Sequence, residues 1–504
     1  MEILSEYLVV SNLTEPVPNS DFAIFLDKTF KFLEFAPEIL DRIEDDLDLK
    51  GKIKKVVRLE DRFFVLEKLA VLPGFDYEGR NAPVADDLIL ESGRPRMDAM
   101  FVYLLLQIQG YRGSLTNQQN MDFLRESITF ARILQRNGWK FPSRSTINEN
   151  LNKVSAETLQ YILDKQIEFI LGLNLDDFKE LTIDSTSVSA DSKWPTDSGI
   201  ILALVQRSFR LSQRLHKFGL DNFRKFHVPR FLKEIKKLDF QINCQSGKRQ
   251  KLNRPYKKLL GKAKKSAQHF VRELEHWKSK TDLQDLLPSK RTQVEWVIDR
   301  ITKDTENIFR TIQNTHKRLF ENKYVPAKDK VLSISDPDAA FIKKGGREPV
   351  VGYKPQLVRS KQGFITELAL PWGNAADSAQ LVPVIEKTIE KTGVLPNLVN
   401  ADDGYASEKA RQHLEKKGIK TVNISGAKGK RIISEEDWDS DIYREARRNR
   451  SAVESLMSIM KGCFGFGRMI VRGLDNVYRS MLQKALAYNL LRCIYRIKQS
   501  LKAT

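Results

Sequence analysis

The chain has 504 residues, of which 41% are hydrophobic, so it is long enough and apolar enough for about two to four domains with their own cores. This composition excludes a disordered chain. The formal net charge of +19 favours a polyanionic partner, although a merely basic soluble protein would carry the same charge.

Cysteine usage and hydropathy indicate the cellular compartment. Cys244, Cys463 and Cys493 show neither CxxC spacing nor a nearby histidine cluster, so neither zinc nor a disulfide framework is indicated. The N-terminus lacks a basic signal-like region, and the longest apolar run, around residues 101–106, is too short to span a bilayer. We therefore expect a cytoplasmic protein that is neither secreted nor bound to a membrane.

The N-terminal part divides into two segments. Residues 1–90 carry no motif that indicates a role, and they include loop signals at residues 73–83. Residues 91–177 are expected to be helical, because Met100, Tyr103, Leu104 and Ile108 recur at helical spacing. Ser145 is expected to cap a helix behind a basic turn. This segment is either a helix-turn-helix domain that binds a DNA end or an ordinary helical bundle.

A strand is expected near residue 184. Leu181 and Ile183 alternate with Thr182 and Asp184, which is the period of a strand. An unpaired carboxylate in the middle of a strand is costly, and a bound cation removes that cost. Asp184 is therefore a candidate metal ligand, unless it lies at an exposed edge or pairs with a buried arginine.

Residues 200–330 are predicted to form an all-helical insertion, with a helical hairpin broken at Pro288. Between Phe223 and Lys265, fifteen Lys and Arg residues accompany only two acids. We call residues 223–265 the basic segment. Such a concentration of charge fits phosphate-backbone binding, whereas a solvated helix face is the alternative. The candidate DNA contacts in this segment are Lys257, Lys258, Lys264 and Lys265.

Strand signals return after the insertion. Strands are expected over residues 331–335, 352–358, 364–370, 398–401 and 419–424, and helices over residues 377–391, 407–417 and the last 30 residues. Together with residues 178–199, residues 331–504 are therefore predicted to form an α/β core with a mixed sheet.

Two further acids complete the candidate site. Asp402 ends an apolar run and is preferred to Asp403, which precedes Gly404 and would shape the turn. Glu454 shares one helical face with basic residues. The alternative is that Glu454 only forms an exposed i,i+4 ion pair with Arg450. The basic residues of this face are Arg447, Arg450 and Lys461. Three acids from distant parts of a basic chain suggest a magnesium site that cuts or joins nucleic acid, since oxygen ligands favour Mg²⁺ or Mn²⁺ over zinc.

These segments resemble the DDE transposases of bacterial insertion sequences. Asp184 lies in a strand, Asp402 begins a D-x-G-Y pattern, and Glu454 lies in R-x(3)-E-x(6)-K, the spacing of the group with a Y-R-E-K signature. The tyrosine position of that signature is Arg447 here. Further similar segments are Gly93-Arg94-Pro95, Pro195-Thr196-Asp197, Ser335-Asp336-Pro337-Asp338 and Gly352-Tyr353-Lys354.

The resemblance implies a ribonuclease H-like core in a nucleoid-associated bacterial protein that works on double-stranded DNA as a homodimer or higher multimer. Asp184, Asp402 and Glu454 would be the catalytic and metal-binding residues, and the second acid is expected just after the fourth core strand. Arg447, Arg450 and Lys461 would bind phosphates of the DNA, and the reaction would cut transposon ends and join them to target DNA. A ribonuclease H-fold nuclease without strand transfer would share the three acids. A domesticated DNA-binding protein would keep the basic segment, but its acids would be free to change.

Overall fold

The computed structural model describes residues 21–48, 60–61, 64, 97–113, 115–216, 228–245, 249–280, 283–344 and 348–503. The chain divides into two compact units, and each is described by itself. The first unit comprises Met1–Leu49, Pro95–Asp191 and Asp338–Thr504, and the second comprises Lys50–Arg94 and Ser192–Pro337. The loop signals at residues 73–83 and the Gly93-Arg94-Pro95 motif lie outside the described residues.

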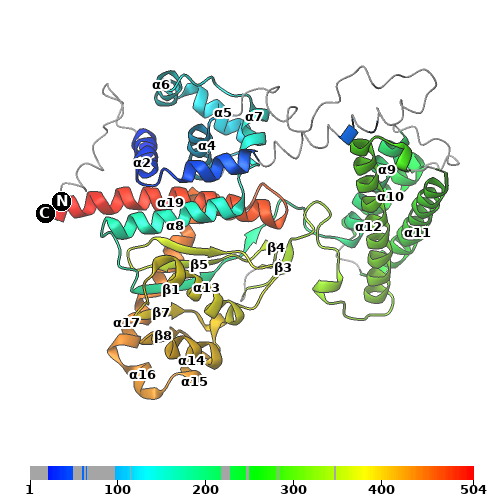
Figure 1. Cartoon of the computed structure of the whole chain (residues 1–504). Coiled ribbons are helices and arrows are strands. Elements are labelled where there is room, and N and C mark those ends of the chain that lie inside the picture. Colours follow the sequence, from blue (N-terminus) through cyan, green and yellow to red (C-terminus); the bar gives the residue numbers. More distant parts are fainter. Residues whose placement is uncertain are drawn as a thin grey trace. The chain divides into compact units, whose positions relative to one another are not determined.

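A mixed five-stranded sheet forms the centre of the first unit (Figure 1). Its strands are β1 (Glu180–Ser185), β5 (Gln356–Ser360), β6 (Ile365–Ala369), β7 (Leu398–Ala401) and β8 (Thr421–Ile424). The spatial order is β6-β5-β1-β7-β8, with β5 antiparallel to β1 and β6, and with β1, β7 and β8 parallel to one another. The predicted α/β class with a mixed sheet is confirmed.

The register of β1 against β7 fixes where the two strands end. Leu181 lies opposite Val399, and Thr182 lies opposite Asn400. Asp184 and Asp402 each follow this last pair by two residues. Because the two strands are parallel, both acids reach the same edge of the sheet.

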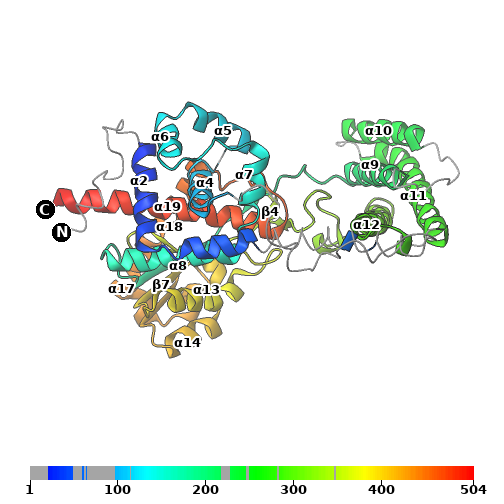
Figure 2. The same cartoon turned by 45° about the horizontal axis from the view of Figure 1, so that its top comes forward.

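Helices cover the sheet. The helices α13 (Asp377–Thr392) and α14 (Glu408–Lys416) share an apolar core with β1, β7 and β8. On the other side, α8 (Ala156–Gly172) and α19 (Leu474–Ala503) run side by side, and α19 also contacts β6 (Figures 1 and 2). The helices α17 (Asp441–Asn449) and α18 (Ser451–Cys463) contact β7 and β1, respectively.

The expected strand over residues 331–335 is wrong, because the structure has no strand there. Arg207 and Arg300 donate to the carbonyl oxygen of Ile334 at 2.6 and 3.4 Å, so side chains use a backbone acceptor that a strand would need. Val331 and Ile334 pack against the apolar core of the second unit. A three-stranded sheet that the sequence did not predict lies instead in the first unit, with the order β2 (Val188–Ser189), β4 (Val350–Tyr353) and β3 (Ala340–Ile342).

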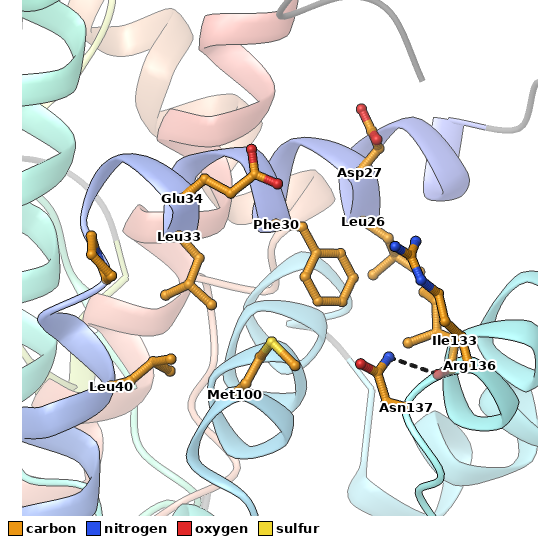
Figure 3. Close-up of a pocket in the computed structure, with 11 residues that line it drawn as sticks. Leu26, Asp27, Phe30, Leu33, Glu34, Leu40, Met100, Ile133, Arg136 and Asn137 are labelled. Carbon is orange, nitrogen blue, oxygen red and sulfur yellow. Dashed lines mark hydrogen bonds between the residues drawn. The ribbon is translucent and has the colours of Figure 1, made fainter. Parts of the chain in front are cut away.

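The helical part before β1 contains α2 (Asp21–Phe35), α4 (Ala99–Tyr111), α5 (Asn117–Glu126), α6 (Ile128–Arg136) and α7 (Arg144–Leu151). Helix α7 is capped by Ser143, whose hydroxyl accepts from the Thr146 amide at 3.2 Å. The expected cap at Ser145 is therefore wrong by two residues. A cavity of about 270 Å³ lies between α2, α4 and α6, with Phe30 and Met100 among its lining residues (Figure 3).

The described part of the second unit contains the long helices α9 (Asp197–His216), α10 (Val228–Cys244), α11 (Arg249–Lys280) and α12 (Pro288–Leu319). They pack around one apolar core. An ion pair between Arg207 and the buried Asp304 links α9 to α12, with one Nε–H···O bond of 2.8 Å. In the described part of the chain, no helix is long and apolar enough to cross a membrane.

A buried ionic cluster joins α8, β6 and α13. Lys391 pairs with Glu367, which is fully buried, and with Asp164 at 3.2 Å. Burial raises the pKa of Glu367 and of Asp164, and Lys391 opposes that shift in both. Removal of one partner from a buried ion pair leaves an uncompensated charge, which costs more than the intact pair contributes.

We predict that Lys391→Met lowers the free energy of unfolding by about 3–5 kcal/mol at neutral pH. The folded-state pKa of Glu367 lies above its unfolded value, so protonated Glu367 favours the folded state, and this contribution disappears as pH rises through the folded pKa. The loss of unfolding free energy in Lys391→Met should therefore be smaller at pH 5 than at pH 8. Urea unfolding at both pH values measures this loss, and the double variant Glu367→Gln/Lys391→Met is the control that should restore stability. An equal loss at both pH values would contradict this account.

Candidate active site

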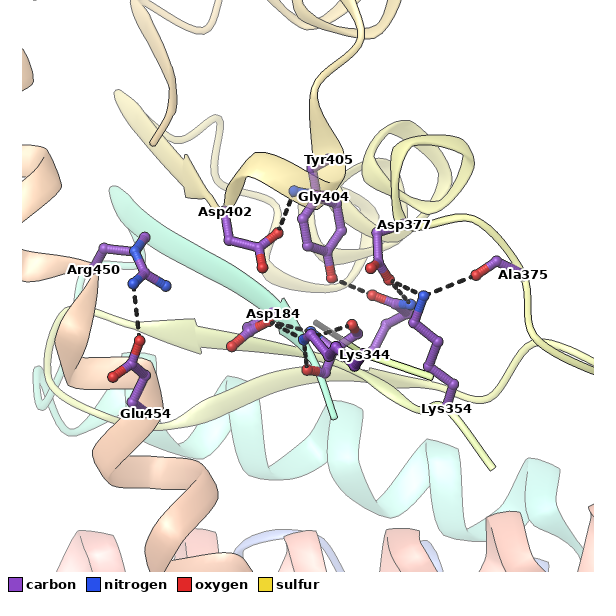
Figure 4. Close-up of polar contacts among 12 residues, drawn as sticks. Asp184, Lys344, Lys354, Ala375, Asp377, Asp402, Gly404, Tyr405, Arg450 and Glu454 are labelled. Atoms are coloured by element: carbon purple, nitrogen blue, oxygen red, sulfur yellow. Dashed lines mark hydrogen bonds and ion pairs between the residues drawn. The ribbon is translucent and has the colours of Figure 1, made fainter. Parts of the chain in front are cut away.

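Asp184 and Asp402 meet at one edge of the five-stranded sheet (Figure 4). The Asp184 side chain is 12% exposed, and its Oδ1 accepts from the Ser185 amide at 2.7 Å. Asp402 accepts from the Gly404 amide at 2.9 Å. Burial raises the pKa of Asp402, and the negative charge of Asp184 raises it further. The charge of Asp184 therefore acts on the Asp402 carboxylate.

Lys344 neutralises part of this charge. Its ammonium group lies 3.1 Å from Asp184 Oδ1 and 3.0 Å from the Ser185 hydroxyl oxygen, and it also donates to the Ser185 carbonyl. Its positive charge lowers the pKa of Asp402. The sequence analysis missed Lys344, because the residue follows β3, a strand that was not predicted, and lies 160 positions from Asp184.

The neighbouring Asp403 has a structural role, because its side chain binds backbone amides. Its Oδ1 accepts from the backbone amides of Lys428 at 2.7 Å and Gly429 at 3.2 Å. Gly426 has a φ of +117°, and a side chain there would also collide with Asp403. Asp403 thus fixes the loop before α15 (Gly429–Ile432), whereas Asp402 is the acid of this turn whose pKa the charge of Asp184 raises.

A buried hydrogen-bond network supports the turn that carries Asp402. The Tyr405 hydroxyl donates to Gln356 Oε1, and Gln356 Nε2 donates to Asp377 at 3.0 Å. Lys354 pairs with the same Asp377 oxygen at 2.9 Å and donates to the Ala375 carbonyl at 3.1 Å (Figure 4). A side chain at Gly404 would lie 3.0 Å from Asp402 and 3.1 Å from Asp377. The turn is held by groups from the β4–β5 connection, β5, α13 and the β6–α13 loop. Of the residues in this network, the sequence motifs indicated only Lys354 and Tyr405.

Glu454 is placed differently from the two aspartates. It lies in the first turn of α18, its side chain is 60% exposed, and it pairs with Arg450 at 2.8 Å. Among the described residues, no group of three or more His, Cys, Asp and Glu side chains is arranged to hold a metal ion. The structure therefore brings Asp184 and Asp402 together, while Glu454 stays with Arg450 on a helix that contacts β1.

The basic residues near Glu454 are not equivalent. The Arg447 guanidinium lies 4.1 Å from the centre of the Trp438 ring and donates to the Trp438 carbonyl at 2.7 Å. These contacts hold Arg447 against α16 (Glu435–Asp439). Lys461 is half-buried in the last turn of α18. Arg450 is thus the basic residue of this face that lies directly against a predicted catalytic acid.

The candidate DNA-binding lysines lie on α11, in the second unit. Lys257, Lys258, Lys264 and Lys265 are all exposed, whereas the intervening Leu259, Leu260 and Ala263 are buried in the bundle core. The helix therefore directs its apolar residues inward and these four charges to the solvent. These exposed ammonium groups fit both alternatives from the sequence, contact with a phosphate backbone and a solvated helix face.

The chemistry of the aspartate pair fits a divalent cation that prefers oxygen ligands. Carboxylate, hydroxyl and carbonyl oxygens are the ligand types of Mg²⁺ and Mn²⁺. Asp184, Ser185 and Asp402 present such oxygens at the sheet edge, and an internal cation, the Lys344 ammonium, already lies among them. Two of the three predicted ligands, Asp184 and Asp402, thus lie at the same edge of the sheet.

Residues 318–490 match the family model of the transposase DDE domain. The match includes Asp402 and Glu454, whereas Asp184 precedes it. No curated protein and no solved structure matches the chain. The predicted resemblance to DDE transposases is confirmed for this part of the chain and indicates DNA transposase activity, while the Y-R-E-K group stays a prediction.

The network behind Asp402 gives a test of its structural role. Tyr405→Phe removes the hydroxyl that donates to the buried Gln356, and an unpaired buried acceptor costs about 1–3 kcal/mol. We expect the free energy of unfolding to fall by that amount in guanidinium titrations. Tyr324→Phe is the control, since Tyr324 is 86% exposed and its change should be close to zero. A Tyr405→Phe variant as stable as the wild type would rule out a supporting role for this bond.

Proposed function

We propose that this protein is a transposase that cuts insertion-sequence ends and joins them to target DNA by metal-dependent phosphoryl transfer. The observation that carries the proposal is the convergence of Asp184 and Asp402 at the ends of the parallel strands β1 and β7. The strand order β6-β5-β1-β7-β8, with Asp402 after the fourth strand of this sheet in chain order, supports a ribonuclease H-like core. The DDE-domain match supports the reaction class.

Asp184 and Asp402 would hold the divalent cation, and Glu454 would complete the ligand set. A bound Mg²⁺ or Mn²⁺ supplies Lewis-acid chemistry, which activates water or a DNA 3′-hydroxyl and stabilises the departing oxygen. The role of the chain is to fix the two aspartates, through the register of β1 with β7 and through the Tyr405 network. Fixed carboxylates need no rearrangement when charge develops on the phosphate.

Glu454 and Arg450 can exchange partners at little cost. An exposed i,i+4 ion pair contributes only about 0.3–0.5 kcal/mol, and Glu454 is the exposed member of this pair. Release of Arg450 from Glu454 would leave its guanidinium for a DNA phosphate, which it binds in a bidentate manner. Lys461 would assist from the end of the same helix. We assign no phosphate contact to Arg447 in this arrangement, because Trp438 engages its guanidinium.

The partner would be double-stranded DNA, bound in part by Lys257, Lys258, Lys264 and Lys265 on α11. Contacts of this kind are made to phosphates and depend little on base sequence. We further propose that two or more copies of the chain act together, because a reaction on two transposon ends needs both ends held at once.

Purified protein incubated with Mg²⁺ and the DNA that flanks its gene should yield cut ends and, with added target DNA, joined products. Gel analysis of labelled DNA measures both products. Cleavage without joined product would indicate a nuclease that lacks strand transfer. DNA binding without cleavage in Mg²⁺ or Mn²⁺ would indicate a non-catalytic DNA-binding protein. Either result would overturn the proposed function.

In the same assay, Glu454→Ala should abolish cleavage, by at least about a hundredfold, while DNA affinity stays within roughly twofold of the wild type. The expected loss is that of an interaction made only in the transition state. Glu445→Ala is the matched control, because Glu445 is an exposed glutamate on the adjacent α17, and it should retain activity. Loss of DNA binding in Glu454→Ala would instead mark Glu454 as structural.

Replacement of Lys257, Lys258, Lys264 and Lys265 by Gln should flatten the salt dependence of DNA binding. Each lost phosphate contact should reduce the slope of log K against log salt by about 0.9. Fluorescence anisotropy at several salt concentrations measures the slope. The control replaces Lys409, Lys416, Lys417 and Lys420, which are exposed on and after α14, and changes the net charge equally. The same slope in wild type and α11 variant would exclude α11 from the DNA interface.

A further inference from the structure

We propose that the Lys344 ammonium occupies the cation position of the aspartate pair in the metal-free protein, and that a divalent cation has to displace it. This inference rests on the proposed function, because it concerns the same pair of aspartates. It assigns a role to a residue outside the three acids and the basic helical face.

The contacts of Lys344 are those of a bound cation. Its ammonium group meets three oxygens of different kinds: the Asp184 carboxylate at 3.1 Å, the Ser185 hydroxyl at 3.0 Å and the Ser185 carbonyl. The Lys344 side chain is 28% exposed, and that of Asp184 is 12% exposed, so the contact is shielded from water on most sides. Carboxylate, hydroxyl and carbonyl oxygens are also the ligands of Mg²⁺. A metal ion bound to Asp184 in this place would therefore meet the ammonium group.

The charges of the pair favour an exchange over joint occupancy. Two carboxylates with one ammonium carry a formal charge of −1, and two carboxylates with one divalent cation carry none. Ammonium and divalent cation together would leave a charge of +1 and place two cations in contact, which is unfavourable in a partly buried site. Lys344 therefore stabilises the metal-free pair and competes with the metal.

Competition of this kind lowers the apparent affinity for the metal. The apparent Kd equals the intrinsic Kd divided by the fraction of molecules in which Lys344 has left the cation position. If Lys344 occupies the position in about nine of ten molecules, removal of its charge tightens metal binding roughly tenfold. The same removal leaves the metal-free aspartates without their counter-ion, so the variant should lose thermal stability without metal and regain it with metal.

Mn²⁺ binding to the metal-stripped full-length protein tests the inference. Isothermal titration calorimetry should give Kd values roughly tenfold lower for Lys344→Met and Lys344→Gln than for the wild type. The matched control is Lys343→Met, which removes an equal charge from the adjacent exposed position and should leave Kd within about twofold. Asp184→Asn should weaken binding in all backgrounds. Thermal denaturation with and without Mn²⁺ confirms that each variant is folded and should show the larger metal-induced rise for Lys344→Met.

The outcomes separate the two proposals. If Asp184→Asn weakens Mn²⁺ binding but Lys344→Met and Lys344→Gln leave Kd at the wild-type value or raise it, Lys344 does not compete and only this inference fails. An equal gain in Lys343→Met and Lys344→Met would also overturn it, since the effect would then be one of overall charge. If no variant binds Mn²⁺, or if Asp184→Asn binds as well as the wild type, the metal site of the proposed function fails as well.

Discussion

The central constraint on this protein is that two like charges are fixed beside each other at the end of two parallel strands. The register of β1 with β7 places Asp184 and Asp402 at the same edge, and burial together with mutual repulsion raises the pKa of Asp402. A fold that keeps such a pair must supply a cation, and the nearest one is the ammonium group of Lys344.

The two aspartates lie on buried, well-supported elements, whereas Glu454 lies on an exposed helix surface. Asp402 stands on a turn held by the buried residues Tyr405, Gln356 and Asp377, and Asp184 lies in the central strand of the sheet. Glu454 lies on a helix surface and forms an i,i+4 ion pair, which is weak and readily exchanged. Such a division suits a site in which two ligands are fixed and a third is recruited when the cation and the DNA are bound, as the proposed function requires.

Local patterns predicted the parts of this site that lie on regular strands. The alternation around Asp184 and the apolar run before Asp402 located both acids, because burial of one face leaves a period in the sequence. Lys344 and Gln356 left no such signal, since their partners lie 160 and 49 positions away and depend on the tertiary fold. The strand expected over residues 331–335 failed for the same reason, because the arginines that bond to the Ile334 carbonyl lie on helices of the second unit. A helical wheel likewise placed Arg447 beside Glu454, yet it contains no information on the aromatic contact with Trp438 that holds the guanidinium.

Not every positive charge that contributes to the net charge of +19 is free to bind DNA, because several basic side chains already have partners in the protein. Lys391 is engaged by two acids, Lys344 by Asp184, and Arg207 by Asp304. Lys484 is buried against the Gly465 carbonyl, and burial lowers its pKa to about 8. None of these groups can add to counter-ion release from DNA without first losing a protein contact. Lys257, Lys258, Lys264 and Lys265 of α11 are exposed to solvent. Under the proposed function, it is the number of such lysines at the DNA, rather than the total charge of the chain, that sets how steeply DNA affinity falls with salt.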